Sequence, residues 1–169
     1  VMGAHYVLTA SIHENVVSNW NWIEALIASV PIAILVMLIV WINQFQDAPS
    51  DAAVGKNTWV VRTAEKGEWM KLEKPLRLYK QFMIEAFVAV ALVGALSFFT
   101  DFGTVYAFMA LIPIALVWKA FKMADEWMIK WNNPNADRQK VPYELLLVNV
   151  STIGIHFLTG ILLAVAYIL

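Results

Sequence analysis

Four long apolar runs dominate the chain and are separated by two polar stretches and one short turn. They cover residues 23–42, 82–100, 104–121 and 146–169. A helix of roughly 20 apolar residues crosses a hydrocarbon core about 30 Å thick. Open strands would leave backbone groups unpaired in lipid, so the runs predict helices. The expected fold class is an all-α integral membrane protein with four transmembrane helices in one domain. A soluble bundle of buried helices is the alternative, and four runs of this length argue against it.

The composition agrees with a membrane protein. The chain has 169 residues, of which 60% are hydrophobic and 15% charged, whereas soluble domains are about 45–50% apolar and about 25% charged. It has no cysteine, which excludes disulfides, thiolate metal sites and cysteine nucleophiles within this sequence. The net charge of −1 gives no basic footprint for nucleic acid. The expected partners are the lipid bilayer, bound lipids and other membrane subunits.

The positive charges give the predicted orientation. All 12 Lys and Arg residues lie within residues 56–80 and 119–140. Because Lys and Arg are retained in cytoplasmic loops, both stretches are predicted to face the cytoplasm. The segment 1–22, the turn 101–103 and the C-terminus then lie outside. The predicted location is a prokaryotic plasma membrane, with both termini extracytoplasmic.

The first cytoplasmic loop, residues 43–81, is predicted to begin irregularly. Its start, "NQFQDAPSDAAVGKN", is rich in turn-forming residues. The runs Thr58–Arg62 and Glu68–Leu72 flank "AEKG" and suit a small β-hairpin. A surface loop with interfacial anchors is the alternative for the same stretch.

The second cytoplasmic segment, residues 122–145, is predicted to continue the third helix as an amphipathic helix that ends at "NNPN". At 100° per residue its polar and apolar side chains separate onto two faces. Such a helix suits the membrane surface, with docking of a partner protein as the alternative. Tryptophan also favours the interface. The polar face holds Lys119, Lys122, Asp125, Glu126 and Lys130, and the apolar face holds Phe121, Ala124, Trp127, Met128 and Trp131. Along the whole chain, the predicted interfacial anchors are Trp20, Trp22, Trp41, Trp118, Trp127 and Trp131.

A polar stripe marks the fourth run. Its members are spaced by three and four, so they share one face of a helix, with Ile155, Leu158 and Leu162 expected opposite. Such a stripe allows close approach and hydrogen bonding to another helix, in this chain or in another subunit. It is also a candidate face for a cofactor or for protons arriving from Glu85. The stripe consists of Asn149, Thr152, His156, Thr159 and Gly160.

Cofactor and metal sites have only weak signals. A b-type haem normally takes two axial ligands, and His5 and His13 lie outside the spans, which leaves Met37, Met83 or Met109 to accompany His156. A haem or quinone shared with a neighbouring subunit is a further candidate. His5, His13 and Glu14 are candidate ligands for copper or zinc, without a recognised spacing. Glu24, at the outer end of the first run, is expected to be interfacial.

These observations favour a non-catalytic, accessory or scaffolding subunit of a larger membrane complex. An energy-converting or oxidoreductase complex is preferred, by analogy with other small four-helix subunits. The chain has no phosphate loop and no zinc-protease motif that would indicate a self-contained active site. One alternative is a subunit that binds a redox cofactor or metal through His156 or through His5 and His13. A second alternative is a small proton- or ion-conducting oligomer.

Overall fold

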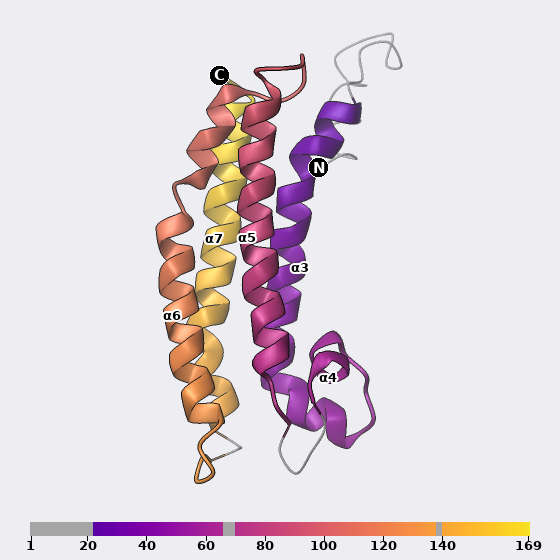
Figure 1. Cartoon of the computed structure of the whole chain (residues 1–169), viewed down its shortest axis with the longest axis vertical. Coiled ribbons are helices and arrows are strands. Elements are labelled where there is room, and N and C mark those ends of the chain that lie inside the picture. Colours follow the sequence, from indigo (N-terminus) through magenta and orange to yellow (C-terminus); the bar gives the residue numbers. More distant parts are fainter. Residues whose placement is uncertain (1–21, 66–69, 138–139) are drawn as a thin grey trace.

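The computed structural model describes residues 22–65, 70–137 and 140–169, and these form a helical bundle (Figure 1). No strand occurs in the described residues. The prediction of an all-α fold is confirmed for this part of the chain. The elements are α3 (Trp22–Ala53), α4 (Trp59–Thr63), α5 (Glu73–Leu96), the 3₁₀ helix η1 (Val105–Leu111), α6 (Ile114–Trp131), the 3₁₀ helix η2 (Val141–Leu145) and α7 (Leu146–Ala166).

Four long helical segments run up and down the bundle in chain order. α3 packs against α5 and α7, η1 packs against α5 and α7, and α6 continues along α7. α5 and α7 therefore lie diagonally across the bundle. In Figure 1 the small helix α4 lies beside the lower parts of α3 and α5. We call the end that holds α4, the last turns of α3 and the end of α6 the cap end. The opposite end, where α3 begins and α7 ends, is the far end.

The described helices are long and apolar enough to cross a membrane four times. The candidate spans are Trp22–Ala53, Glu73–Leu96, Val105–Trp131 and Val141–Ala166. Only 33–39% of the residues in each apolar stretch are buried inside the bundle. Most apolar side chains consequently face outward, which suits contact with lipid and not with water.

The first helix extends well beyond its apolar run. Irregular backbone was expected from Asn43, but α3 continues to Ala53 and includes Pro49. Phe45, Ala48 and Asp51 continue the inward-facing spacing of the preceding turns and are buried. Packing of this face therefore outweighs the turn-forming composition of the stretch. The expectation that the chain is irregular from Asn43 was wrong.

The predicted hairpin is also wrong within the described residues. Thr58–Arg62 was expected to be a strand, but Trp59–Thr63 forms the helix α4. One antiparallel bridge joins Glu65 and Lys71, with N–O distances of 3.3 and 3.1 Å. Val60 and Val61 of α4 are buried against the cap end. The apolar residues that suggested a strand thus bury one side of a short helix. Residues 66–69, within the expected hairpin, lie outside the described part.

The third span is divided into η1 and α6 at Pro113. Proline has no N–H to donate to the preceding turn, and the α-helix begins anew after Pro113. The turn before η1 depends on Gly103, whose φ is +83°. A Cβ at this position would lie 2.3 Å from the Val93 carbonyl oxygen, so only glycine fits. α6 then runs without interruption to Trp131, as predicted for residues 122–131.

The apolar face of α6 packs into the bundle and not onto the membrane surface. Ala124 is fully buried, and Trp127 and Trp131 are almost so. All three belong to the large hydrophobic core at the cap end. The predicted amphipathic helix is present, but the prediction that its apolar face lies on the membrane surface was wrong. That face packs against other helices of the same chain.

Candidate functional site

The contact between α3 and α7 positions two members of the predicted polar stripe, Asn149 and Gly160. Asn149 Nδ2 donates to Asn43 Oδ1 at 2.7 Å. A Cβ on Gly160 would lie 3.8 Å from Ile32 Cδ1. The two pairs are eleven residues apart on both helices, which fixes one antiparallel register along their whole contact. We call this contact the α3/α7 seam.

A second polar contact crosses the bundle between α5 and α7. The Tyr79 hydroxyl and Thr152 Oγ1 are 2.6 Å apart, and both residues are fully buried. Thr152 Oγ1 also lies 2.8 Å from the Val148 carbonyl oxygen, to which it donates its single proton. Tyr79 is therefore the donor to Thr152. This arrangement satisfies both buried hydroxyls, which is the role expected of polar groups between membrane helices.

Two other members of the stripe are buried without complete pairing. Thr159 is fully buried, and its Oγ1 has no hydrogen-bond partner in the described part of the chain. The same holds for Asn149 Oδ1. Ile155, expected on the opposite face, is instead fully buried between these residues. The inward face of α7 is thus a mixture of polar and large apolar side chains.

His156 is the middle residue of the 21-residue α7. Its position in the register places it level with Val36 on α3, at the edge of the α3/α7 seam. The residue is half-buried, whereas Thr152 and Thr159 lie fully inside. Its imidazole makes no hydrogen bond or ion pair to any residue that the structure describes. His156 is therefore partly exposed at mid-span, with an unused polar side chain.

Glu85 lies on α5, on the helix diagonally opposite α7. It is half-buried and accepts a hydrogen bond from Gln81 Nε2 at 2.8 Å. Lys80, five residues before Glu85, pairs with Asp125 at 2.5 Å and lies 5.4 Å from the Phe121 ring centre. No hydrogen bond among the described residues joins Glu85 to His156.

Three of the predicted interfacial tryptophans are internal residues. Trp41, Trp127 and Trp131 are 5%, 3% and 2% exposed. Each indole N–H donates to a backbone carbonyl of a distant segment, with acceptors Pro75, Val141 and Met70 at 3.3, 2.7 and 3.0 Å. The expectation that they anchor the protein at the lipid interface is corrected.

The other tryptophans that the structure describes are exposed. Trp22 and Trp118 are 49% and 77% exposed, as an interfacial anchor would be. Trp59 lies against Trp41, with ring centres 5.6 Å apart and ring planes tilted by 57°. Trp20, His5, His13 and Glu14 lie outside the described residues.

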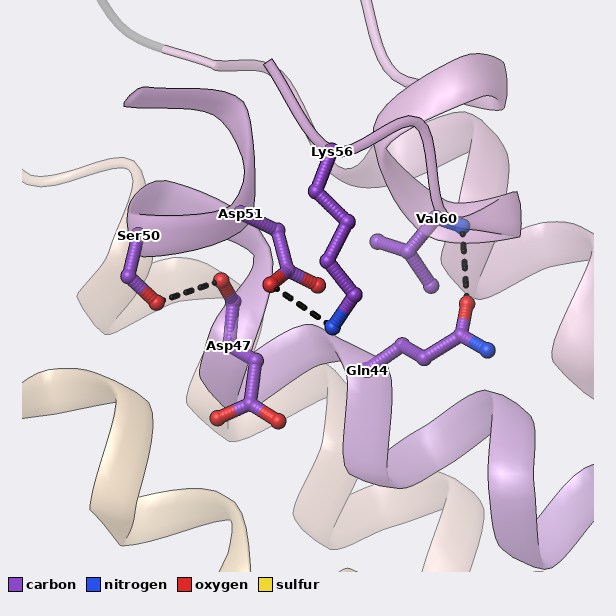
Figure 2. Close-up of polar contacts among 6 residues, drawn as sticks. All are labelled: Gln44, Asp47, Ser50, Asp51, Lys56 and Val60. Carbon is purple, nitrogen blue, oxygen red and sulfur yellow. Dashed lines mark hydrogen bonds and ion pairs between the residues drawn. The ribbon is translucent and has the colours of Figure 1, made fainter. Parts of the chain in front are cut away.

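Polar contacts tie the end of α3 to α4 at the cap end (Figure 2). Lys56 Nζ lies 3.1 Å from Asp51 Oδ1, and the Asp51 side chain is only 10% exposed. The Val60 N–H donates to Gln44 Oε1 at 3.3 Å, and Ser50 Oγ donates to the Asp47 carbonyl at 2.8 Å. The Ser50 bond lies within the last turns of α3, whereas the Lys56 and Val60 contacts hold the following chain against α3. Their role is structural, and the sequence pattern did not indicate it.

A cavity of about 430 Å³ lies in the α3/α7 seam at the far end. α3 contributes Glu24, Ala25, Ala28 and Ile32, and α7 with its C-terminal cap contributes Gly160, Leu163, Ala164 and Tyr167. Ala25, Ala28 and Ile32 lie level with Tyr167, Ala164 and Gly160 in the register. The sequence analysis missed this cavity. The sequence does show small side chains spaced by three and four on these two helices. Whether they face each other and leave a cavity can be decided only once the register of α3 against α7 is known.

Metal ligands do not gather in the described part of the chain: no group of three His, Asp or Glu side chains there is placed to hold an ion. Met83 is fully buried on α5, while Met37 and Met109 are half-buried. Comparison with models of known protein families, with curated proteins and with solved structures found no match to this chain.

Proposed function

We propose that this chain is an accessory, non-catalytic subunit of a larger membrane complex, and that the α3/α7 seam around His156 docks on a neighbouring subunit. An energy-converting or oxidoreductase complex is the preferred assembly. The observation that carries the proposal is the half-buried His156 at the middle of α7, without a hydrogen-bond partner among the described residues.

The energetics of a bilayer give this observation its weight. An ionisable side chain in the middle of a span is costly when it faces lipid, and such residues normally face protein or a water-filled cavity. Thr152 of the same stripe finds its partner in Tyr79 within the chain. His156 does not, so a hydrogen-bonding group from another subunit is the simplest way to satisfy it.

The proposal includes an orientation with the cap end in the cytoplasm. The segments that hold all 12 Lys and Arg residues of the sequence include α4, the first turns of α5 and the second half of α6. All of these belong to the cap end. Positive charge is retained on the cytoplasmic side, so the far end, with Tyr167, lies on the extracytoplasmic side.

The test is gentle detergent extraction of the full chain from its native membrane, followed by native gel electrophoresis and mass spectrometry of the co-migrating proteins. The wild-type chain is expected in a larger complex. His156→Leu should weaken that association about threefold to thirtyfold, since hydrogen bonds between membrane helices contribute about 0.6–2 kcal/mol. Phe157→Leu is the matched control, because Phe157 is the next residue and 62% exposed. A wild-type chain that migrates alone would refute the proposal.

A redox role is the second candidate, and the same imidazole favours it. An unpaired histidine at the edge of a bundle can provide one axial ligand to a haem whose second ligand comes from a neighbour. In that case the isolated complex shows a visible absorption band that shifts or disappears in His156→Leu. A colourless complex of full size would exclude this candidate and leave the scaffolding role.

A further inference from the structure

Charge is distributed unevenly around the cap end. The helices α4, α5 and α6 carry the Lys and Arg residues of the long and short helices, whereas α3, η2 and α7 contain no Lys or Arg. The charged side chains that α3, η2 and α7 contribute to this end are acidic, namely Asp47, Asp51 and Glu144. The α5/α6 side, which lies across the bundle from the α3/α7 seam, is therefore the positive side of the cap end.

The cations of this positive side are also the unpaired ones. Next to η2, Lys130 pairs with Glu144 at 2.6 Å. Lys140 pairs with Asp137 at 3.5 Å. Five exposed cations of α4, α5 and α6 make no ion pair or hydrogen bond with any residue that the structure describes, and the exposed Glu126 of α6, which also lacks a partner there, offsets one of these charges. The five are Arg62, Lys74, Arg77, Lys119 and Lys122.

Two contacts fix the level of α5 against α6. Lys80 of α5 pairs with Asp125 of α6. Asn132, which follows α6, donates from Nδ2 to a Glu73 carboxylate oxygen at 3.0 Å. The two contacts are seven residues apart on both chain segments, so α5 and α6 run antiparallel in one register.

On both helices the outward face changes from apolar to basic at the same depth. On α5, Ile84 is 55% exposed and lies seven residues from Arg77, on the same face. On α6, Trp118 is 77% exposed and lies four residues from Lys122, again on the same face. The register places Lys122 level with Met83, the neighbour of Ile84, and Arg77 about 9 Å further toward the cap end. One amphiphilic molecule can therefore contact the apolar and the basic part of this surface together.

An anionic phospholipid is the occupant that matches this surface. Tryptophan and basic side chains at the end of an apolar stripe are typical of the head-group layer of a bilayer. A zwitterionic phospholipid has no net charge, and its ammonium group would add to a positive charge that Glu126 offsets only in part. An acidic protein would neutralise Arg77 and Lys122 but has no need of the exposed apolar side chains beside them.

We propose that the α5/α6 face of the cap end binds the head group of an anionic phospholipid, with Arg77 and Lys122 as its cationic contacts and the acyl chains along Ile84 and Trp118. The proposal rests on insertion of the four helices in a bilayer, as the proposed function also does, but not on docking through His156. It places the bound lipid and the neighbouring subunit on opposite sides of the bundle.

Native mass spectrometry of the purified full chain tests the proposal, in detergent micelles with equal amounts of phosphatidylglycerol and phosphatidylcholine that share the same acyl chains. The wild type should retain phosphatidylglycerol in preference to phosphatidylcholine. Arg77→Gln and Lys122→Gln should each lower this preference about fivefold, the equivalent of about 1 kcal/mol per cation. Lys140→Gln is the matched control, because it removes the same charge from the cap end at an 82% exposed side chain paired with Asp137. It should leave the preference unchanged.

The outcomes separate the lipid site from its rivals. Equal retention of the two lipids by the wild type would overturn the proposal. An equal loss of preference in all three variants would assign it to the net charge of the cap end and overturn the site on α5 and α6. Retention of neither lipid, with loss of the larger native complex in Arg77→Gln, would point to an acidic protein partner instead.

The variants keep the proposal falsifiable. Arg77 and Lys122 are exposed and without partners among the described residues, so both variants should fold, which circular dichroism checks, and either variant alone decides the question. His156→Leu should keep the lipid preference while losing the larger complex. Failure of the lipid site is therefore distinguishable from failure of the proposed docking role.

Discussion

The two ends of the bundle differ in the size of the side chains between their helices, which are large and aromatic at the cap end and mostly smaller in the α3/α7 seam at the far end. At the cap end, Trp127 and Trp131 stack with ring centres 5.5 Å apart, and Phe45 packs edge-on against Trp127 at 6.0 Å. At the far end, alanine and glycine line the α3/α7 seam and leave a cavity. The cap end also lies beside the part of α3 that extends beyond the apolar run, where α4 and η2 add to the core.

This difference indicates a division of labour. Large buried aromatic side chains contribute most of the free energy of folding per residue, and their indole N–H groups join segments that are distant in sequence. Small side chains contribute little packing energy but allow a ligand or another subunit to approach the backbone. We therefore expect the core of the cap end to determine stability and the α3/α7 seam with His156 to determine docking.

Removal of a cap-end aromatic should have the largest effect. Trp127→Ala leaves a cavity and removes the donor to the Val141 carbonyl, so the free energy of unfolding should fall by about 3–5 kcal/mol. Trp118→Ala, at a 77% exposed residue of the same helix, should change it little. Unfolding in mixed detergent micelles, followed by circular dichroism, measures both. Similar losses in the two variants would contradict a stabilising cap core.

The same substitution at the two ends gives the most direct comparison. Ala124 is fully buried in the cap core, so Ala124→Leu should overpack it and cost about 1–3 kcal/mol. Ala28 lines the far-end cavity, which has room for the added atoms, so Ala28→Leu should cost less than about 0.5 kcal/mol. The same unfolding measurement applies. If Ala28→Leu were as costly as Ala124→Leu, the far end would be as densely packed as the cap.

The polar contact between α5 and α7 should have an intermediate effect. Tyr79→Phe removes the donor to Thr152 while leaving the bond from Thr152 to the Val148 carbonyl, so the expected loss is about 1 kcal/mol. Thr152→Val should cost more, because it leaves the Tyr79 hydroxyl buried and unpaired. In the double variant the loss should be smaller than the sum of the two. Additive losses would show that the two hydroxyls act independently.

The positions of the four candidate spans were predictable from the sequence, whereas the structure of the cap end was not. Run length alone distinguishes a membrane helix from other elements, which is why residues 23–42 fall within α3 and why α7 begins where the run 146–169 begins and ends three residues before it. The helical continuation through Pro49 depends on burial of Phe45 and Ala48 against other segments. Local composition favours a turn at that point, and only tertiary contact reverses the preference.

The tryptophans show a second limit of sequence reasoning. An aromatic residue next to Lys or Arg is typical of the lipid interface, and Trp118 is consistent with that pattern. Trp127 has the same local pattern, and Trp41 ends an apolar run, but both are buried, because α4 packs against Trp41 and η2 against Trp127. Whether a segment between spans folds back over an aromatic face depends on contacts distant in sequence. For the same reason, the stripe on α7 was identifiable, but the half-exposed position of His156 and the cavity required the register with α3.

The smallest effect is expected at the ion pair that holds the loop before α4. Lys56→Gln leaves the Asp51 carboxylate, which is only 10% exposed, without its cation, and the free energy of unfolding should fall by about 0.5–1 kcal/mol. Lys71→Gln is the matched control at a pair whose partners are 67% and 68% exposed, and it should have almost no effect. Because salt screens the Lys56–Asp51 attraction, the loss in Lys56→Gln should shrink as the salt concentration rises. A loss of several kcal/mol, comparable with that in Trp127→Ala, would mean that charge and not aromatic packing holds the cap end together.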